Sequence, residues 1–163
     1  MPPGIPSRKA AIWSPAAGEA GAEAVSLERL LRESDVVTIH TRLSDRTRGL
    51  LGAKQLAWMR ASSVLINTSR GPIVDEGALV EALRSRRIAG AGLDVYDIEP
   101  LPAGHPLLKL DNVALTPHLG YVTHEVYRGF YSQTLENILA YLNGEPKRVL
   151  NPEVWERRRR AAP

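Results

Sequence analysis

The chain has 163 residues, 44% hydrophobic and 24% charged, which suits one globular domain with a buried core and excludes a disordered chain. It contains no cysteine, which excludes disulfides, thiolate metal sites and a cysteine nucleophile, and no signal peptide or apolar stretch of roughly 20 residues is recognisable. Its net charge of +3 depends on the terminal run Arg157–Arg160, so the rest of the chain has no basic excess and we predict no nucleic-acid partner. Because neither a membrane span nor a signal peptide is recognisable, we predict a cytoplasmic protein without a membrane partner.

The N-terminal segment predicts little regular structure. Met1–Ser7 holds three prolines and a glycine, and we expect a disordered leader there. Arg8–Pro15 contains a brief apolar run that favours one short strand, and Ala16–Ala24 predicts a loop. Ser26 is the predicted N-cap of a helix over Leu27–Arg32.

Four short apolar runs predict strands, because each is followed by polar or turn-forming residues. They are Val36–His40, Ser63–Asn67, Ala91–Tyr96 and Asn112–Leu115. The first is continuous and β-branched and is predicted to be fully buried. Helical patterns over Gly52–Met59 and over Glu76–Arg87, which Asp75 can cap, separate the strands as in right-handed βαβ units. The sequence thus predicts an α/β fold with a parallel sheet flanked by helices.

The C-terminal part predicts one long helix from Thr123 to about Leu142. Two neighbouring rows of apolar side chains give it a wide apolar stripe: Val126, Phe130, Ile138 and Leu142, and Tyr127, Tyr131, Leu135 and Leu139. Asn143 and Gly144 end this helix. We expect the basic segment 151–163 to be a disordered tail.

Polar side chains follow the strands at their carboxyl ends, where open parallel sheets bind ligands. Arg70 lies in a glycine-flanked loop, and its planar guanidinium suits a bidentate grip on a carboxylate; a surface ion pair is the alternative. His118 follows another strand and can exchange a proton near neutral pH; a structural histidine is the alternative.

A carboxylate beside His118 would fix the tautomer of its ring. Glu99 is our choice for this carboxylate, and Asp97 is the competing choice. Among the other histidines, His40 is predicted to be structural or to face a cofactor, and both His105 and His124 are predicted to be exposed to solvent.

Nine short motifs between Ser34 and Gly144 carry a resemblance to a known family. They are Ser34-Asp35-Val36-Val37, Thr47-Arg48-Gly49-Leu50, Leu65-Ile66-Asn67-Thr68-Ser69-Arg70-Gly71, Val74-Asp75-Glu76, Ala91-Gly92-Leu93-Asp94-Val95, Glu99-Pro100, Pro102, Asp111-Asn112-Val113 and Thr116-Pro117-His118-Leu119-Gly120. In this order they resemble the D-isomer-specific 2-hydroxyacid dehydrogenases, in particular the second half of their NAD-binding domain.

The resemblance implies a role for each matching residue. Arg70 matches the arginine that clamps the substrate carboxylate, His118 the general acid/base on the 2-oxygen, and Glu99 the carboxylate paired with it. The positions that line the cofactor match His40, Thr41, Thr68, Ser69, Asp94 and Gly120. No metal ligand is implied.

The chain also departs from the family pattern. Its members are about twice as long, and their substrate lobe and the first βαβ unit with its G-x-G-x-x-G loop have no counterpart here. We therefore expect a leader (1–7), a partial Rossmann-type NAD(P)-binding domain (8–122), a long helix returning to the substrate lobe (123–150) and the basic tail. Ser14 stands where the family usually has an acidic residue on the adenosine ribose, which leaves NAD and NADP both open.

The first functional hypothesis is an oxidoreductase that transfers a hydride between NAD(P)H and a small 2-oxo or 2-hydroxy acid. The alternatives are a truncated, catalytically silent fragment and a non-catalytic oligomerising or binding module on the same fold. Because the apolar stripe of the long helix needs a partner, we also predict a homo-oligomer, and a homodimer in particular.

Overall fold

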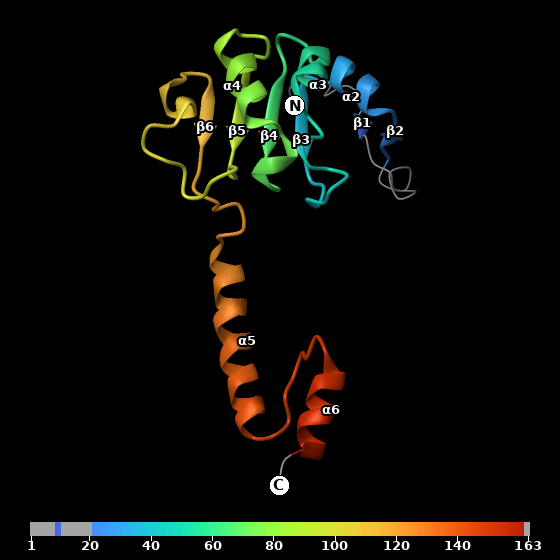
Figure 1. Cartoon of the computed structure of the whole chain (residues 1–163), viewed down its shortest axis with the longest axis vertical. Helices are drawn as coiled ribbons and strands as arrows, with labels where there is room; N and C mark the ends of the chain where they lie inside the picture. The colour runs from blue at the N-terminus through green and yellow to red at the C-terminus, as the bar shows by residue number, and fades with distance from the viewer. Residues whose placement is uncertain (1–8, 11–20, 162–163) are drawn as a thin grey trace. The chain divides into compact units, whose positions relative to one another are not determined.

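The computed structural model describes residues 9–10 and 21–161, and it divides the chain into two compact units, Met1–Gly120 and Tyr121–Pro163. The predicted leader (1–7) and Ser14 lie outside the described residues. The two units are described separately below, and Figure 1 gives the order of their elements along the chain.

The first unit is organised around a parallel sheet of four strands. The strands are β3 (Val36–Ile39), β4 (Val64–Asn67), β5 (Gly90–Leu93) and β6 (Val113–Leu115), and they lie in that order across the sheet. Two further short strands, β1 (Lys9–Ala10) and β2 (Glu23–Ala24), form a separate parallel pair. The predicted α/β class and parallel sheet are therefore confirmed, and all four strands of the larger sheet end at the same edge.

Three helices accompany these strands, α2 (Leu27–Glu33), α3 (Ala53–Trp58) and α4 (Glu76–Arg84), and they form a row in Figure 1. The predicted N-caps of two of them are confirmed. Ser26 Oγ accepts the Arg29 amide at 3.3 Å, and Asp75 Oδ1 accepts the Ala78 amide at 2.9 Å. Such caps satisfy helix N-terminal amides that have no intrahelical acceptor.

Helix α4 ends at Arg84, three residues before the predicted end. The Ser85 hydroxyl donates to the Glu81 carbonyl, and Arg86 has a left-handed backbone with φ 56°. A residue in this conformation cannot continue a right-handed helix. The apolar pattern continues in Ile88, which is buried in the core beyond the end of the helix.

One hydrophobic core fills the space between the helices and the sheet. Its fully buried side chains include Leu31, Leu56, Leu65, Leu83 and Leu107. The prediction that the first strand is fully buried was wrong, since side chains along β3 alternate between exposed and buried and Val36 is 61% exposed. Only one face of this strand, with Val37 and Ile39, packs against the core.

The second unit contains two helices, α5 (His124–Leu142) and α6 (Pro152–Ala161). The long helix is confirmed, and Thr123 Oγ1 caps it by accepting the Val126 amide at 3.2 Å. The predicted disordered tail instead contains α6, whose proline and glutamate in the first turn favour helix initiation. Among the described residues, no helix combines the length and apolar character needed to cross a membrane.

Two short 3₁₀ helices that the sequence pattern did not predict, η1 (Gly71–Ile73) and η2 (Pro106–Lys109), complete the first unit. Each follows a loop that carries polar side chains at the carboxyl edge of the sheet. Both begin with a proline in the first turn, where its missing amide hydrogen costs nothing.

Candidate active site

The loop after β4 presents Arg70 on a fixed backbone. Asn67, only 1% exposed, accepts the Ser69 amide through Oδ1 at 3.0 Å and donates through Nδ2 to the Arg70 carbonyl at 2.9 Å. The Ser69 hydroxyl donates to the carbonyl of Thr41, which follows β3. The loop is therefore tied to itself and to the neighbouring strand end, while the Arg70 side chain is exposed.

The loop after β6 is held by one buried carboxylate. Asp94 is 5% exposed, and its Oδ1 accepts the Thr116 hydroxyl and the Leu119 amide, the latter at 2.7 Å. Its Oδ2 accepts the Gly120 amide, also at 2.7 Å. Both oxygens of a residue at the end of β5 thus bind the segment that carries His118.

Hydrogen bonding decides the protonation state of Asp94. Burial by itself raises the pKa of this carboxyl, but the hydrogen bonds from Thr116, Leu119 and Gly120 outweigh it and hold the pKa below its ordinary value. Asp94 is therefore ionised at neutral pH. Its negative charge strengthens each of the three hydrogen bonds it accepts.

The centre of the site is the contact between His118 and Glu99. His118 Nδ1 lies 2.7 Å from Glu99 Oε2, so the ring carries a proton on Nδ1 and donates it to the carboxylate. The other ring nitrogen, Nε2, is then the one that can exchange a proton with a substrate. His118 also has a left-handed backbone with φ 57°, an unusual conformation for histidine that clusters at functional sites.

The Glu99 carboxylate is itself held from two sides. Its Oε1 accepts a hydrogen bond from the Tyr96 amide at 3.0 Å, while Oε2 accepts one from His118 Nδ1. The hydrogen bond from His118 is the main cause that lowers the pKa of Glu99, and the Tyr96 amide and the positive charge of Arg70 act in the same direction. Arg70 is thus close enough to act electrostatically on the Glu99–His118 pair.

The residues expected to line a cofactor fall into smaller groups. A Cβ at Gly120 would lie 2.9 Å from Asp94 Oδ2 and 3.9 Å from Thr68 Cβ, so these three residues meet at one point. Ser69 contacts Thr41 as described above. The ring of His40 lies 2.9 Å from the hydroxyl of Thr38, and the structure shows no closer link to the other residues of this set in the described part of the chain.

Tyr96, which was not among the residues predicted from the sequence to form the site, joins the loop after β5 to the loop after β6. It is 6% exposed, and its hydroxyl lies 3.0 Å from the Leu93 carbonyl and 2.9 Å from the Thr116 carbonyl. Its backbone packs on Gly71 so closely that a Cβ there would lie 2.1 Å from the Tyr96 carbonyl carbon. A glycine beside the site arginine was the one available signal for such an approach.

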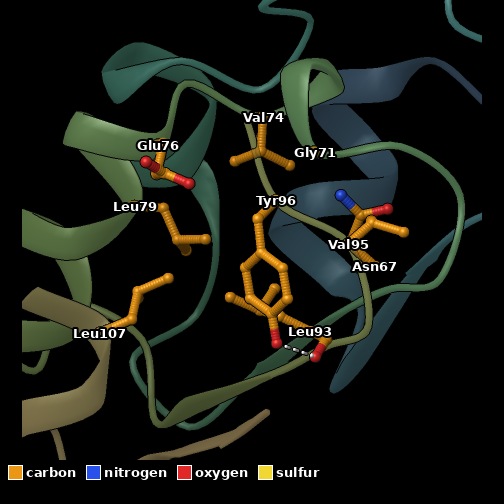
Figure 2. Close-up of a pocket in the computed structure, with 9 residues that line it drawn as sticks. All are labelled: Asn67, Gly71, Val74, Glu76, Leu79, Leu93, Val95, Tyr96 and Leu107. Carbon is orange, nitrogen blue, oxygen red and sulfur yellow. Dashed lines mark hydrogen bonds between the residues drawn. The ribbon is translucent and has the colours of Figure 1, made fainter. Parts of the chain in front are cut away.

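A small cavity lies behind the site but cannot be the substrate pocket. Its volume is about 10 Å³, whereas pockets for small molecules enclose roughly 300 Å³ or more. Figure 2 shows the nine residues that line it, with the Tyr96 ring at the centre and its hydroxyl directed at Leu93. The candidate residues Arg70 and His118 lie instead in the loops at the carboxyl edge of the sheet.

His105 and His124 were both predicted to be exposed to solvent, and the structure agrees for only one of them. The prediction that His105 is exposed was wrong, because its side chain is only 15% exposed and its Nε2 lies 3.0 Å from Glu76 Oε1. His105 is half-buried against Glu76 at the start of α4, 29 residues earlier in the sequence. His124, at the start of α5, is exposed as predicted.

Replacing Asp94 tests how the His118 loop is held. In Asp94→Asn one carboxylate oxygen becomes an NH₂ group that faces an N–H donor, and we expect a loss of about 1–3 kcal/mol in unfolding free energy at pH 7. Because the pKa of Asp94 is lowered, this stabilisation is complete above the ordinary aspartate pKa and disappears as the pH falls through the lowered pKa. Urea unfolding of both proteins at several pH values measures the difference.

The matched control for that experiment is Asp111→Asn. Asp111 forms an exposed ion pair with Arg86, and such pairs contribute about 0–1 kcal/mol. Equal losses in the two variants would contradict the anchoring role of Asp94.

Comparison with known protein sequences gives a consistent assignment. The family described as "D-isomer specific 2-hydroxyacid dehydrogenase, NAD binding domain" matches residues 7–120. A glyoxylate reductase of Korarchaeum cryptofilum is 46% identical over 137 residues, 83% of this chain and 41% of that protein. A glyoxylate/hydroxypyruvate reductase B of Enterobacter agglomerans is 45% identical over 134 residues, 82% of this chain and 42% of that protein.

Solved structures agree with the sequence matches. The NAD complexed form of a D-isomer specific 2-hydroxyacid dehydrogenase from Lactobacillus delbrueckii ssp. bulgaricus has a TM-score of 0.70 and 33% identity, over 85% of this chain and 46% of that one. An acyclic imino acid reductase in complex with NADPH and D-Arg has a TM-score of 0.67 and 35% identity, over 80% of this chain and 41% of that one.

The chain spans about two fifths of the length of the curated relatives it matches. The family match covers most of the first unit, from which Arg70, Glu99 and His118 come. It also confirms the resemblance inferred from the nine sequence motifs. The chain belongs to the D-isomer specific 2-hydroxyacid dehydrogenase family, within which it matches the NAD-binding domain.

Proposed function

We propose that this chain contributes the catalytic pair and the nicotinamide side of an NAD(P)-dependent dehydrogenase acting on a small 2-oxo or 2-hydroxy acid. The observation that carries the proposal is the 2.7 Å contact between His118 Nδ1 and the ionised Glu99 carboxylate, close to Arg70. The relatives named for glyoxylate and hydroxypyruvate reduction support an acid of that size.

His118 would serve as the general acid in the reduction of a 2-oxo acid. The nicotinamide cofactor supplies the hydride that adds to C2 of the substrate. As negative charge develops on the 2-oxygen, the protonated ring gives that oxygen the proton on Nε2 and becomes neutral. Glu99 keeps the other ring proton on Nδ1, which leaves Nε2 as the nitrogen that would exchange a proton with the 2-oxygen. In the reverse direction the neutral ring accepts the proton.

Arg70 would bind the carboxylate of the same substrate. Its side chain is exposed, while hydrogen bonds from Asn67 and Ser69 fix the backbone beneath it. A guanidinium forms two parallel hydrogen bonds with a carboxylate, which sets the orientation of the adjacent C2 as well as its position. Selectivity between one small acid and another is not explained by Arg70, because every 2-oxo acid has this carboxylate.

The residues at the sheet edge fit the nicotinamide end of a dinucleotide. Thr41, Thr68 and His40 offer hydroxyl and ring donors or acceptors at the ends of two neighbouring strands, which suits ribose hydroxyls and a carboxamide. The resemblance places Asp94 among the residues that line the cofactor. In the structure both of its oxygens bind the 116–120 segment, which supports an indirect contribution through that segment.

The alternative is that this chain by itself is catalytically silent and at most binds ligand weakly. It is favoured by the coverage of only 41% of the relatives and by a sequence without a G-x-G-x-x-G loop to bind the cofactor pyrophosphate. The two proposals agree on ancestry and differ in whether these 163 residues bind cofactor and turn over.

Cofactor titration followed by substrate addition separates the two proposals. We expect quenching or enhancement of NADH or NADPH fluorescence at micromolar protein, and then cofactor oxidation when glyoxylate or hydroxypyruvate is added. His118→Ala should lower the oxidation rate by about 100-fold or more, since general acid catalysis contributes that much. The matched control, His124→Ala, removes an exposed histidine of the second unit and should leave the rate unchanged. No binding at millimolar cofactor would support the silent alternative.

We propose further that the chain forms a homodimer through α5. Seven large apolar or aromatic side chains of this helix are exposed and could form the dimer interface. They are Tyr127, Phe130, Tyr131, Leu135, Ile138, Leu139 and Leu142. Contiguous apolar surface of this kind marks association sites.

Sedimentation velocity tests the proposed dimer. We expect the wild-type chain to sediment as a dimer and Ile138→Lys to shift it toward monomer, because a charge would be buried in the interface. Glu125→Lys, at the polar start of the same helix, is the control. A wild-type chain that is monomeric at all concentrations would rule out this proposal.

A further inference from the structure

A second glutamate–histidine pair lies behind the candidate active site. Glu76 Oε1 is 3.0 Å from His105 Nε2, and their side chains are only 25% and 15% exposed. His105 Nδ1 accepts the Leu107 amide at 3.3 Å, so the ring proton lies on Nε2 and is donated to Glu76. The orientation of this ring is therefore fixed at both nitrogens.

The second oxygen of Glu76 faces the active-site loop. Glu76 Oε2 lies 3.4 Å from the amide nitrogen of Asp97, which donates to it. One carboxylate thus connects three segments: the start of α4, the loop after β5 and the start of η2. None of the roles proposed for Arg70, Glu99 and His118 uses Glu76 or His105.

Two contacts hold the backbone of residues 96 and 97, the packing on Gly71 and the hydrogen bond to Glu76. This backbone packs on Gly71, where a Cβ would lie 2.1 Å from the Tyr96 carbonyl carbon and 2.6 Å from the Asp97 nitrogen. Figure 2 shows Glu76 and Tyr96 on the wall of the same small cavity, with Glu76 on the α4 side. The Tyr96 amide is the donor that holds Glu99 Oε1 at 3.0 Å.

We propose that Glu76 and His105 are positioning residues, which fix the backbone of Tyr96 and Asp97 and thereby hold the Glu99 carboxylate against His118. The amide that binds Glu99 and the amide that binds Glu76 belong to consecutive residues. A displacement of the Asp97 amide therefore also moves the neighbouring Tyr96 amide, and the Glu99 carboxylate that this amide binds moves with it. The importance of this support for turnover rests on the proposed dehydrogenase function, whereas the geometry does not.

Other charged groups surround the pair and must be kept constant in any test. The Asp97 carboxylate interacts with Glu76, Asp75, His105 and Arg48. Replacing Glu76 with an uncharged residue therefore changes the field at Asp97 as well as the hydrogen bonds. A second variant that leaves Glu76 charged is needed to separate the two effects.

The direct readout is the pH titration of the Glu99 side-chain carboxyl, followed by ¹³C NMR in the cofactor-free chain. In Glu76→Gln an NH₂ group replaces one oxygen and faces either the His105 or the Asp97 N–H donor. We expect the Glu99 pKa, lowered in the wild type by His118 and the Tyr96 amide, to rise toward its ordinary value. Glu81→Gln, on the exposed side of the same helix, is the matched control and should leave the Glu99 titration unchanged.

His105 supplies the second pair of variants. His105→Ala removes the proton donor to Glu76 and should shift the Glu99 titration upward, as Glu76→Gln does. His105→Gln keeps an N–H donor and a carbonyl acceptor, so it should restore most of the wild-type titration. Rescue by the conservative variant distinguishes positioning by a hydrogen bond from simple filling of space.

The two proposals can fail independently. If Glu76→Gln and His105→Ala lower the thermal midpoint but leave the Glu99 titration at its wild-type value, the pair is only structural and the positioning proposal is overturned. If the chain binds no NADH or NADPH, the dehydrogenase proposal fails, and the Glu99 titration still decides the role of Glu76 and His105.

Discussion

The ionised carboxylate of Asp94 is the constraint on which the candidate site depends. It lies at the end of β5 and accepts three hydrogen bonds from the segment that follows β6. A buried charge is expensive unless it is fully hydrogen-bonded, and here the hydrogen bonds outweigh the effect of burial on its pKa. The segment therefore has one favoured path, on which His118 takes its left-handed backbone conformation.

The parallel sheet explains why residues distant in sequence meet at this place. All four strands of the larger sheet end at the same edge, so the loops after β4, β5 and β6 leave it side by side. Each loop is held by buried polar groups: Asn67 fixes the first, Tyr96 joins the second to the third, and Asp94 fixes the third. The candidate site residues Arg70, Glu99 and His118 thus extend from loops that these hydrogen bonds hold in place, an arrangement that suits a preorganised site.

Local pattern was enough to predict most of the elements from the sequence, because strand and helix periodicity and the caps Ser26 and Asp75 depend on residues close to one another. Two of the errors came from non-local contacts. The exposure of Val36 depends on what covers its face of the sheet, and the partial burial of His105 depends on its contact with Glu76, 29 residues earlier in the sequence. The partners of Asp94 are 22 to 26 residues away in the sequence, so no spacing rule could reveal them.

Amide hydrogen exchange at Leu119 and Gly120 in the ¹⁵N-labelled wild-type chain tests the central claim most directly. Both amides lie in a short loop outside any helix or strand, where exchange would be fast unless Asp94 accepts their hydrogens. The account predicts exchange at both positions that is slower than in an unstructured peptide and close to that of the Ser69 amide, which Asn67 holds. Exchange of both amides at the unstructured rate, with Ser69 still protected, would show that Asp94 does not anchor the loop that carries His118.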